Sequence, residues 1–318
     1  MTEYLYGFKL MGEDIELAID HPEAQRIFIE AETMIRDYEQ RYSTHAEKSE
    51  VLAINQAAGQ QAVVVSLDLY DLIKTGRDIG LATQGIFNIT IGPITTLWHG
   101  DFSQAQVPDK NLIDAKLDLL QPADIQLNDE LRSVYLTKPG MALDLGVISK
   151  GYFADRLKQF FYENGVNSGM INLGKNLITL GHANERHDGY WLVKLPNPLR
   201  QDGQFLGELK TRNEAVVISS INERKLKVGD KYYHHIFDAR TGYPIDSQIA
   251  SVIIVSDQAI TGEIWSTVLF IQTPQQALRW LNQAPSIEGI IVTKEKQVIV
   301  SEKLKNKVIL CSDIEMLG

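Results

Sequence analysis

The chain has 318 residues, 44% hydrophobic and 23% charged, which is ordinary for a water-soluble globular protein with a sizeable core. Its formal charge of -10 disfavours a general nucleic-acid binder, because phosphate binding needs a basic face. The single cysteine, Cys311, excludes an internal disulfide, a Cys-rich zinc site and a C-x-x-C redox pair. We expect one domain over residues 1–318, or two tightly joined lobes.

The sequence offers no candidate membrane segment. No apolar run approaches the roughly 20 residues that span a bilayer. The first residues lack the basic region and continuous apolar core of a signal peptide. We therefore expect a cytoplasmic protein with no membrane insertion and no nucleic-acid partner.

In chain order, the first helix is predicted after Asp20, which can cap it, with Pro22 in the first turn and Glu23 completing a capping box. A second helix is predicted between Ser66 and Gly85, since Leu69, Leu72, Ile73 and Ile79 recur at helical spacing. Both helices are expected to cover a sheet.

Short β-branched segments bounded by polar residues predict strands at 215–219, 251–256, 289–293 and 297–301. Gly229-Asp230 is a two-residue hairpin signal, so His234 and His235 are expected on the return strand. Helical and strand patterns together predict a fold in which helices and sheet are mixed.

The segment Phe87–Trp98 joins an expected extended run to a Gly-Pro break and a tryptophan. Such a segment suits one wall of a flat-ligand site, but a core strand ending in a turn has the same pattern. These residues alone favour the core strand.

Asp144 and Lys150 flank a small-residue turn that opens an expected amphipathic helix carrying Phe153, Leu157 and Phe161. Free amides at a helix start suit a phosphate. A mutual ion pair or a simple turn cap explains the two charged residues equally well.

The stretch from Gly169 to Asn176 fits seven positions of a G-x-x-x-x-G-K-[ST] phosphate loop. We reject that match because Met170 to Leu173 have the pattern of a buried strand and Asn176 replaces the metal-binding hydroxyl. Gly174-Lys175 is expected to end a strand close to a ligand.

Adjacent residues of a strand point to opposite faces, so only one of His234 and His235 can enter a site from it. The turn from Asp238 to Gly242 follows at once and supplies an acid, a base and a tight turn. This segment is therefore the favoured location of a functional site.

Glu263 and Thr267 lie one turn apart on one face of an expected helix. A carboxylate and a hydroxyl so placed can share a magnesium ion, which prefers hard oxygen ligands. An exposed glutamate beside a helix-stabilising threonine is the simpler interpretation of these two residues alone.

Taken together and in this order, these segments resemble the FAD:protein FMN transferase family, also called the ApbE family. The resemblance runs from Met11 to about Leu269. The segments that carry it are Met11-Gly12, Ser49-Glu50 with Asn55, Gly85–Trp98, Leu143–Gly151, Ile171–Asn176, Ser219-Ser220, His234–Pro244 and Glu263–Thr267.

The resemblance implies a tunnelling-fold-like α+β architecture with mixed or antiparallel sheets covered by helices. It implies a magnesium-dependent transferase that moves FMN from FAD to a Thr or Ser hydroxyl of an acceptor protein and releases AMP. The same site could serve an FAD pyrophosphatase, and a non-catalytic flavin-binding protein is a third possibility.

The resemblance also implies site residues. Those expected along FAD are Met11, Ile86, Phe87, Asn88, Asp144, Lys150, Lys175 and His235. The magnesium ligands are expected to be the Val147 carbonyl and the side chains of Glu263 and Thr267, with His235 and Asp238 as catalytic residues.

This chain departs from the family pattern at four positions. Asn88 and Glu263 each replace an aspartate, whereas Lys175 and Ser220 each replace a glycine. The fold should survive these changes. A longer carboxylate at a metal ligand can shift the site enough to slow a tightly positioned reaction about 100-fold.

Overall fold

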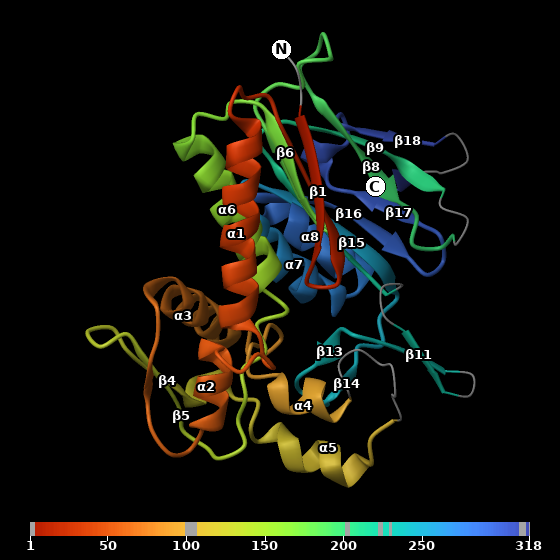
Figure 1. Ribbon diagram of the computed structural model, residues 1–318. Coiled ribbons are helices and arrows are strands. Elements are labelled where there is room, and N and C mark those ends of the chain that lie inside the picture. Colours follow the sequence, from red (N-terminus) through yellow and green to blue (C-terminus); the bar gives the residue numbers. More distant parts are fainter. Residues whose placement is uncertain are drawn as a thin grey trace. The chain divides into compact units, whose positions relative to one another are not determined.

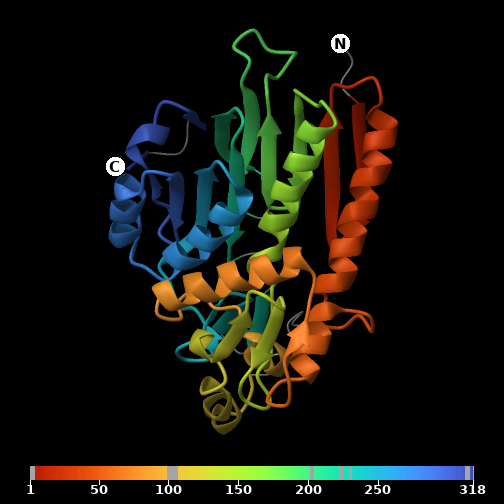
Figure 2. The ribbon, with the colours of Figure 1, turned by 90° about the vertical axis from the view of Figure 1, so that its left-hand side faces the viewer.

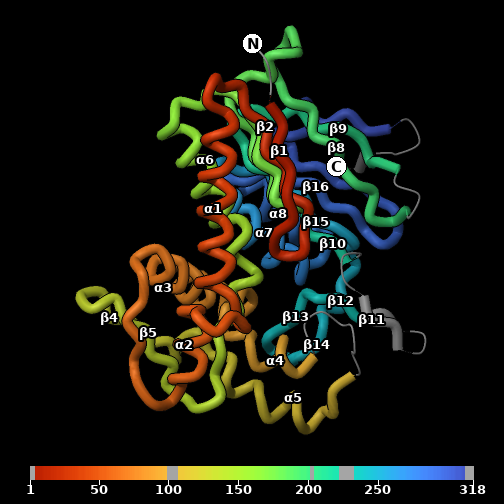
Figure 3. Tube along the Cα trace, in the orientation of Figure 1, coloured from red at the N-terminus to blue at the C-terminus, as the bar shows by residue number. Residues whose placement is uncertain are grey.

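The structure, a computed structural model, describes residues 4–98, 107–200, 204–221, 225–228, 231–311 and 316–317 (Figure 1). The chain divides into two compact units. Unit 1 contains Met1–Arg36, Lys150–Ser220 and Ser247–Gly318, and unit 2 contains Asp37–Ser149 and Ile221–Asp246. The path in Figure 3, red to blue, passes between the units at 36/37, 149/150, 220/221 and 246/247. A single domain over residues 1–318 stays a prediction.

Unit 1 is built on a nine-stranded sheet in the order β1-β2-β6-β7-β10-β15-β16-β17-β19. All neighbouring strands are antiparallel except β17 and β19, which are parallel. The strands are β1 (Tyr4–Leu10), β2 (Glu13–Ile19), β6 (Gly169–Leu173), β7 (Asn176–Leu180), β10 (Ala215–Ser220), β15 (Ile249–Ser256), β16 (Ile287–Thr293), β17 (Val298–Val300) and β19 (Met316–Leu317).

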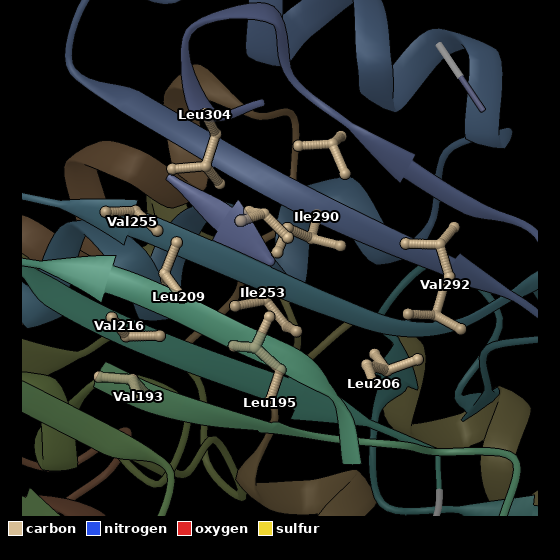
Figure 4. Close-up of a cluster of buried hydrophobic side chains, with 13 residues drawn as sticks. Val193, Leu195, Leu206, Leu209, Val216, Ile253, Val255, Ile290, Val292 and Leu304 are labelled. Carbon is tan, nitrogen blue, oxygen red and sulfur yellow. The ribbon is translucent and has the colours of Figure 1, made fainter. Parts of the chain in front are cut away.

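One face of this sheet packs on a second sheet of three strands, β8 (Trp191–Pro196), β9 (Phe205–Thr211) and β18 (Val308–Leu310). Alternate residues of the large sheet, such as Ile253 and Val255, meet Leu195 and Leu209 of the small one in a buried cluster (Figure 4). Period-two alternation places these side chains on the shared inner face.

The helices of unit 1 pack on the large sheet (Figure 2). Helix α7 (Ala259–Phe270) contacts β7, β10 and β15, and α8 (Pro274–Gln283) contacts β16 and β17. The β-branched strand β15 is buried along its whole length, because the small sheet covers one face and α7 the other. Helix α6 (Ser149–Glu163) begins where the chain enters the unit, and the 3-10 turn η2 spans Glu302–Leu304.

The described part of unit 2 holds helices of different lengths, a three-stranded sheet and two pairs of antiparallel strands. Helix α1 (Ala24–Tyr42) begins in unit 1 and ends here. The other helices are α2 (Glu50–Gln56), α3 (Leu67–Ala82), α4 (Gly92–Leu97), α5 (Lys110–Leu117) and the 3-10 turn η1 (Pro122–Asp124). The strands are β3 (Val63–Val64), β4 (Ile125–Asn128), β5 (Ser133–Leu136), β11 (Lys225–Val228), β12 (Lys231–His234), β13 (Phe237–Asp238) and β14 (Tyr243–Pro244).

An ion-pair network joins three helix ends in unit 2. Arg41 near the end of α1 contacts Glu50 at the start of α2 and Asp68 in the first turn of α3, at 3.2 and 2.6 Å. Glu50 also accepts a hydrogen bond from the Ser66 amide at 2.6 Å. The network therefore fixes the entry points of α2 and α3 relative to the end of α1.

The mixed α+β prediction is confirmed, as are both long helices, the four strands and the pairing of β11 with β12. The expected Gly229-Asp230 turn lies outside the described residues. The return strand ends at His234, so the expectation that it also carries His235 was wrong. The expected cap of the first helix was wrong: the Glu23 amide donates to His21 Nδ1 at 3.1 Å, and Asp20 accepts from Asn184. Of the described helices, none is both long and apolar enough to cross a membrane.

The expected extended run after Phe87 was also wrong, because residues 87–90 form turns and Gly92 opens helix α4. Pro93 suits a first helical turn, where no hydrogen bond is lost by its missing N–H. Trp98 ends the segment fully buried. Trp98 is therefore a core residue, as the sequence favoured, although the segment before it is not a strand.

Candidate active site

The Glu263 carboxylate is buried in unit 1 and forms a polar cluster with the Gly151 amide and the Asn176 side chain. Its Oε2 accepts from the Gly151 amide at 2.8 Å, and its Oε1 accepts from Asn176 Nδ2 at 2.9 Å. Burial raises its pKa to about 7, although these hydrogen bonds and the charge of Lys150 lower it. The interpretation of Glu263 as an exposed glutamate is therefore wrong.

The starts of α6 and α7 lie close enough to hold this carboxylate. Asp155 on α6 accepts from the Ala259 and Ile260 amides at 2.8 and 2.9 Å and so caps α7. A side chain at Gly151 would place its Cβ 2.7 Å from the Ala259 carbonyl oxygen. Glycine at 151 therefore lets the two helices approach and leaves its own amide beside Glu263.

Thr267 lies one turn after Glu263 on α7 and is half-buried. The intervening Ser266 hydroxyl donates to the Glu263 carbonyl at 3.0 Å and accepts from Ser219 on β10 at 2.9 Å. These contacts fix the turn of α7 that carries both predicted ligands to the end of β10.

Lys150 and Glu13 form an ion pair at 2.9 Å in the same unit. Glu13 follows the Met11-Gly12 turn, whose φ angles of 52° and 73° are those of a type I′ hairpin. A Cβ at Gly174 would lie 3.0 Å from the Glu13 carboxyl group. The glycine therefore allows the β6–β7 turn, which also carries Lys175, to approach this pair.

The described oxygen donors fit a divalent ion of the magnesium type. Glu263 supplies a carboxylate and Thr267 a hydroxyl, and magnesium prefers such hard ligands. Asn176 Oδ1 is buried and accepts no hydrogen bond from any described residue. Among the described residues, no group of three or more His, Cys, Asp and Glu side chains could hold a metal ion.

The predicted residues of unit 2 include Asp144, whose backbone is held from two sides. Its amide donates to the Ile89 carbonyl at 2.9 Å. Asn55 clamps the preceding Leu143 by donating to its carbonyl at 3.0 Å and accepting from its amide at 2.7 Å. The Asp144 carboxylate accepts from the Gly146 amide at 2.9 Å, so it caps the turn before Val147.

Asn88 is buried and uses both ends of its amide. Its Nδ2 donates to the Leu120 carbonyl at 2.7 Å, and its Oδ1 accepts from the Thr90 amide and hydroxyl at 2.8 and 2.6 Å. The ring of neighbouring Phe87 is fully buried and Ile86 is half-buried. Within this segment, the Phe87 ring therefore belongs to the core of unit 2.

The two histidines have different environments, although only His234 belongs to a strand. His234 is buried, its Nε2 donates to the Ile245 carbonyl at 2.8 Å, and its Nδ1 accepts from the Ile236 amide at 3.3 Å. That pair of contacts requires the neutral ring. His235 is half-buried and follows the end of β12.

Asp238 belongs to the turn between β13 and β14. Its carboxylate contacts the Arg240 side chain at 2.8 and 2.9 Å, and its carbonyl accepts from the Gly242 amide at 2.8 Å. Trp98 Nε1 donates to the Gly242 carbonyl at 3.0 Å. The contacts of Asp238 are therefore those of a residue that shapes the turn.

Three comparisons with known proteins bear on this arrangement. A family model described as the ApbE family matches residues 11–291. The chain belongs to the ApbE family. An ApbE-family relative from Klebsiella pneumoniae, named FAD:protein FMN transferase, is 36% identical over 94% of this chain and 92% of its own. One of the same name from Treponema pallidum is 27% identical over 87% and 79%.

Solved ApbE structures share the fold. The ApbE protein of Thermotoga maritima aligns with a TM-score of 0.88 at 24% identity, covering 96% of this chain and 99% of its own. The flavin transferase ApbE of Vibrio cholerae aligns with a TM-score of 0.80 at 18% identity, with the same coverage. At these identities, the two structures establish the shared architecture.

Sequence reasoning missed four residues that build the described clusters: Glu13, Asn55, the Gly151 amide and Asn176. Asn55, Gly151 and Asn176 each end one of the family segments, which was the available signal for them. Glu13 had none, because an ion pair across 137 residues leaves no spacing pattern.

Proposed function

We propose that the chain is a magnesium-dependent FAD:protein FMN transferase, which moves FMN from FAD to a Thr or Ser hydroxyl of an acceptor protein. Membership of a transferase family supports the activity. The observation that carries the mechanism is the buried Glu263 carboxylate, which accepts hydrogen bonds from the Gly151 amide and the Asn176 side chain. Gly151 directly follows Lys150 in the chain. A buried carboxylate with hydrogen-bond donors on both oxygens is a pre-organised cation ligand.

The proposed metal ligands are Glu263, Thr267 and the Val147 carbonyl, which lies four residues before Gly151 in the chain. When bound there, magnesium would withdraw charge from the FAD pyrophosphate and stabilise the charge that develops on phosphorus substitution. Its positive charge would also favour the ionised form of Glu263, whose pKa burial raises to about 7.

The proposed FAD contacts are the half-buried Met11, Ile86, Lys150 and Lys175, together with Phe87, Asn88, Asp144 and His235. An ammonium has three donors, so Lys150 can keep its ion pair with Glu13 while it donates to a phosphate oxygen. Because Phe87 and Asn88 are buried, their proposed role is to set the loop that FAD contacts.

His235 is the proposed general base. An imidazole titrates near neutral pH and can accept the proton of the acceptor hydroxyl as its oxygen attacks the FMN phosphorus. The new phosphoester bond forms as the bond from that phosphorus to the AMP oxygen breaks, and AMP leaves. Asp238 would hold the following turn through Arg240 and thereby position His235.

The test is to incubate the purified protein with FAD, magnesium and a candidate acceptor. An FMN-sized mass gain on a Thr or Ser, measured by mass spectrometry, would support transfer. Free FMN with an unmodified acceptor would indicate the pyrophosphatase reaction, in which water replaces the hydroxyl. Intact FAD despite tight binding would contradict both enzymatic functions and favour a flavin-binding protein.

Glu263→Ala tests the metal assignment separately. We expect the magnesium concentration needed for half-maximal turnover to rise at least tenfold, since one ligand is lost. Thr273→Ala is a suitable control because Thr273 caps α8, outside the cluster. Unchanged turnover of Glu263→Ala at limiting magnesium would refute this assignment.

A further inference from the structure

Asn176 is the side chain that donates to the Glu263 carboxylate, and only 2% of its surface is exposed. Its Nδ2 donates to Glu263 Oε1 at 2.9 Å, so the amide nitrogen faces the carboxylate. Its Oδ1 is buried and accepts no hydrogen bond from the residues that the structure describes. Buried amide oxygens ordinarily have a partner, because leaving one unpaired costs free energy.

The backbone leaves Asn176 little freedom to find another partner. It is the first residue of β7, paired with Val217 of β10, and it lies two residues after Gly174, whose φ is +75°. If the amide were reversed, Oδ1 would face the carboxylate oxygen and repel it whenever Glu263 is ionised. With Glu263 ionised, the hydrogen bond from Asn176 Nδ2 therefore fixes the orientation of the amide and leaves Oδ1 facing away from the carboxylate.

We propose that Asn176 Oδ1 is a further ligand of the divalent ion at Glu263, an inference that rests on the proposed magnesium-dependent function. An amide oxygen is a hard, neutral ligand of the kind that magnesium accepts. The three ligands proposed above, Glu263, Thr267 and the Val147 carbonyl, would leave open positions of the octahedron that magnesium prefers. The amide would thus orient Glu263 through nitrogen and bind the ion through oxygen.

A role limited to orienting Glu263 makes a different prediction. In that case the ion would have no bond to Asn176, and only the hydrogen bond from Nδ2 would matter. The two roles are separable by detecting the bond itself, which requires no turnover.

The experiment uses the full-length protein with Mn²⁺, a hard ion that stands in for magnesium, and asparagine labelled with ¹³C at the side-chain carbonyl. Pulsed electron–nuclear double resonance measures the coupling between Mn²⁺ and nearby ¹³C. We expect a strong coupling, of the size found for a directly bound amide, that disappears in Asn176→Asp made with unlabelled aspartate.

Asn172→Asp is the matched control. Asn172 also donates to a carboxylate, that of Glu16 at 3.0 Å, but it lies outside the Glu263 cluster. This variant should keep the coupling. Glu263→Ala should weaken Mn²⁺ binding at least tenfold, which would place the ion at Glu263.

Mn²⁺ bound at Glu263 without the strong ¹³C coupling would overturn the inference and leave the proposed function intact. Absence of Mn²⁺ binding, together with intact FAD in the transfer assay, would overturn both. The overturning result, absence of the strong coupling, is measured on the unsubstituted chain, so misfolding of a variant cannot produce it.

Discussion

Glu263 has an acid–base property that the metal-free protein should reveal. Its folded-state pKa is about 7, above the ordinary value of 4.5, because burial disfavours the charged form. Because the pKa is higher in the folded state, the contribution of Glu263 to the free energy of unfolding is complete below pH 4.5 and is lost as the pH rises to about 7. The difference between the folded and unfolded pKa values corresponds to about 3 kcal/mol of that free energy.

We therefore predict that Glu263→Gln removes this part of the pH dependence of stability. The free energy of unfolding, measured with urea in EDTA, should fall less between pH 4.5 and 7 in the variant than in the unsubstituted chain. Asp155, another buried carboxyl with a raised pKa, is present in both proteins. Its charge also raises the pKa of Glu263, so the difference between the two curves includes the interaction of the two carboxyl groups. Parallel curves would contradict the burial of an ionisable group at 263.

His235 and His234 should respond differently to substitution. His235→Asn is predicted to lower the transfer rate by about 10² to 10⁴, the usual contribution of a general base, with little change in stability. His234→Asn loses buried hydrogen bonds to the Ile245 carbonyl and the Ile236 amide and should lower the melting temperature. Equal effects of the two substitutions on rate and stability would be inconsistent with the assignment.

At the scale of elements, the hairpin of β13 and β14 depends on a glycine. Gly242 has φ +70°, and a Cβ there would lie 2.5 Å from Ile113 on α5. Trp98 packs on Tyr233, Phe237 and Tyr243 with ring centroids 5.4 to 5.8 Å apart. The turn is therefore fixed by the side chains under it.

Gly242→Ala is predicted to destabilise the protein more than Gly85→Ala. Both glycines have positive φ, but a Cβ at Gly85 has no neighbour within 4 Å. Gly85→Ala should cost only the left-handed backbone, about 1 kcal/mol, and Gly242→Ala should add steric overlap. Urea unfolding of both variants measures the difference, and equal losses would contradict the packing at Ile113.

Elements governed by local periodicity were predictable from sequence. The helix after Ser66 and the β-branched strands follow apolar spacing that the chain shows directly. Helix α4 was missed because Gly92-Pro93 resembles a strand-ending break, and its six residues are too few for a helical period. The sequence could not predict the hydrogen-bond partners of Glu263. Gly151 and Asn176 are distant from it in the chain and approach it only when α6, α7 and β7 pack together.

At the scale of the whole molecule, neither unit is one continuous segment. Unit 2 takes residues 221–246 from a distant part of the chain, and these supply Ala239 to the buried cluster around Trp98. A fragment of residues 37–149 would thus leave that cluster incomplete. The family assignment is independent of this division, because it rests on segments from both units.

We predict that the fragment 37–149 alone does not form a native cluster and that joining residues 221–246 to it by a flexible linker restores one. Trp98 is the one tryptophan in that fragment, so its fluorescence reports on the cluster directly. The joined fragment should emit at shorter wavelength and give a near-ultraviolet circular dichroism signal. A buried Trp98 in the short fragment would show that 221–246 is dispensable.

Asn88 has a consequence for protein engineering. Its amide donates to the Leu120 carbonyl and accepts from Thr90, so its two ends are not interchangeable. An engineer who installed aspartate, the residue that the family resemblance implies at this position, would set a carboxylate oxygen against a carbonyl oxygen in a buried place. Asn88→Asp would thus work only together with a new hydrogen-bond donor for that carboxylate near Leu120.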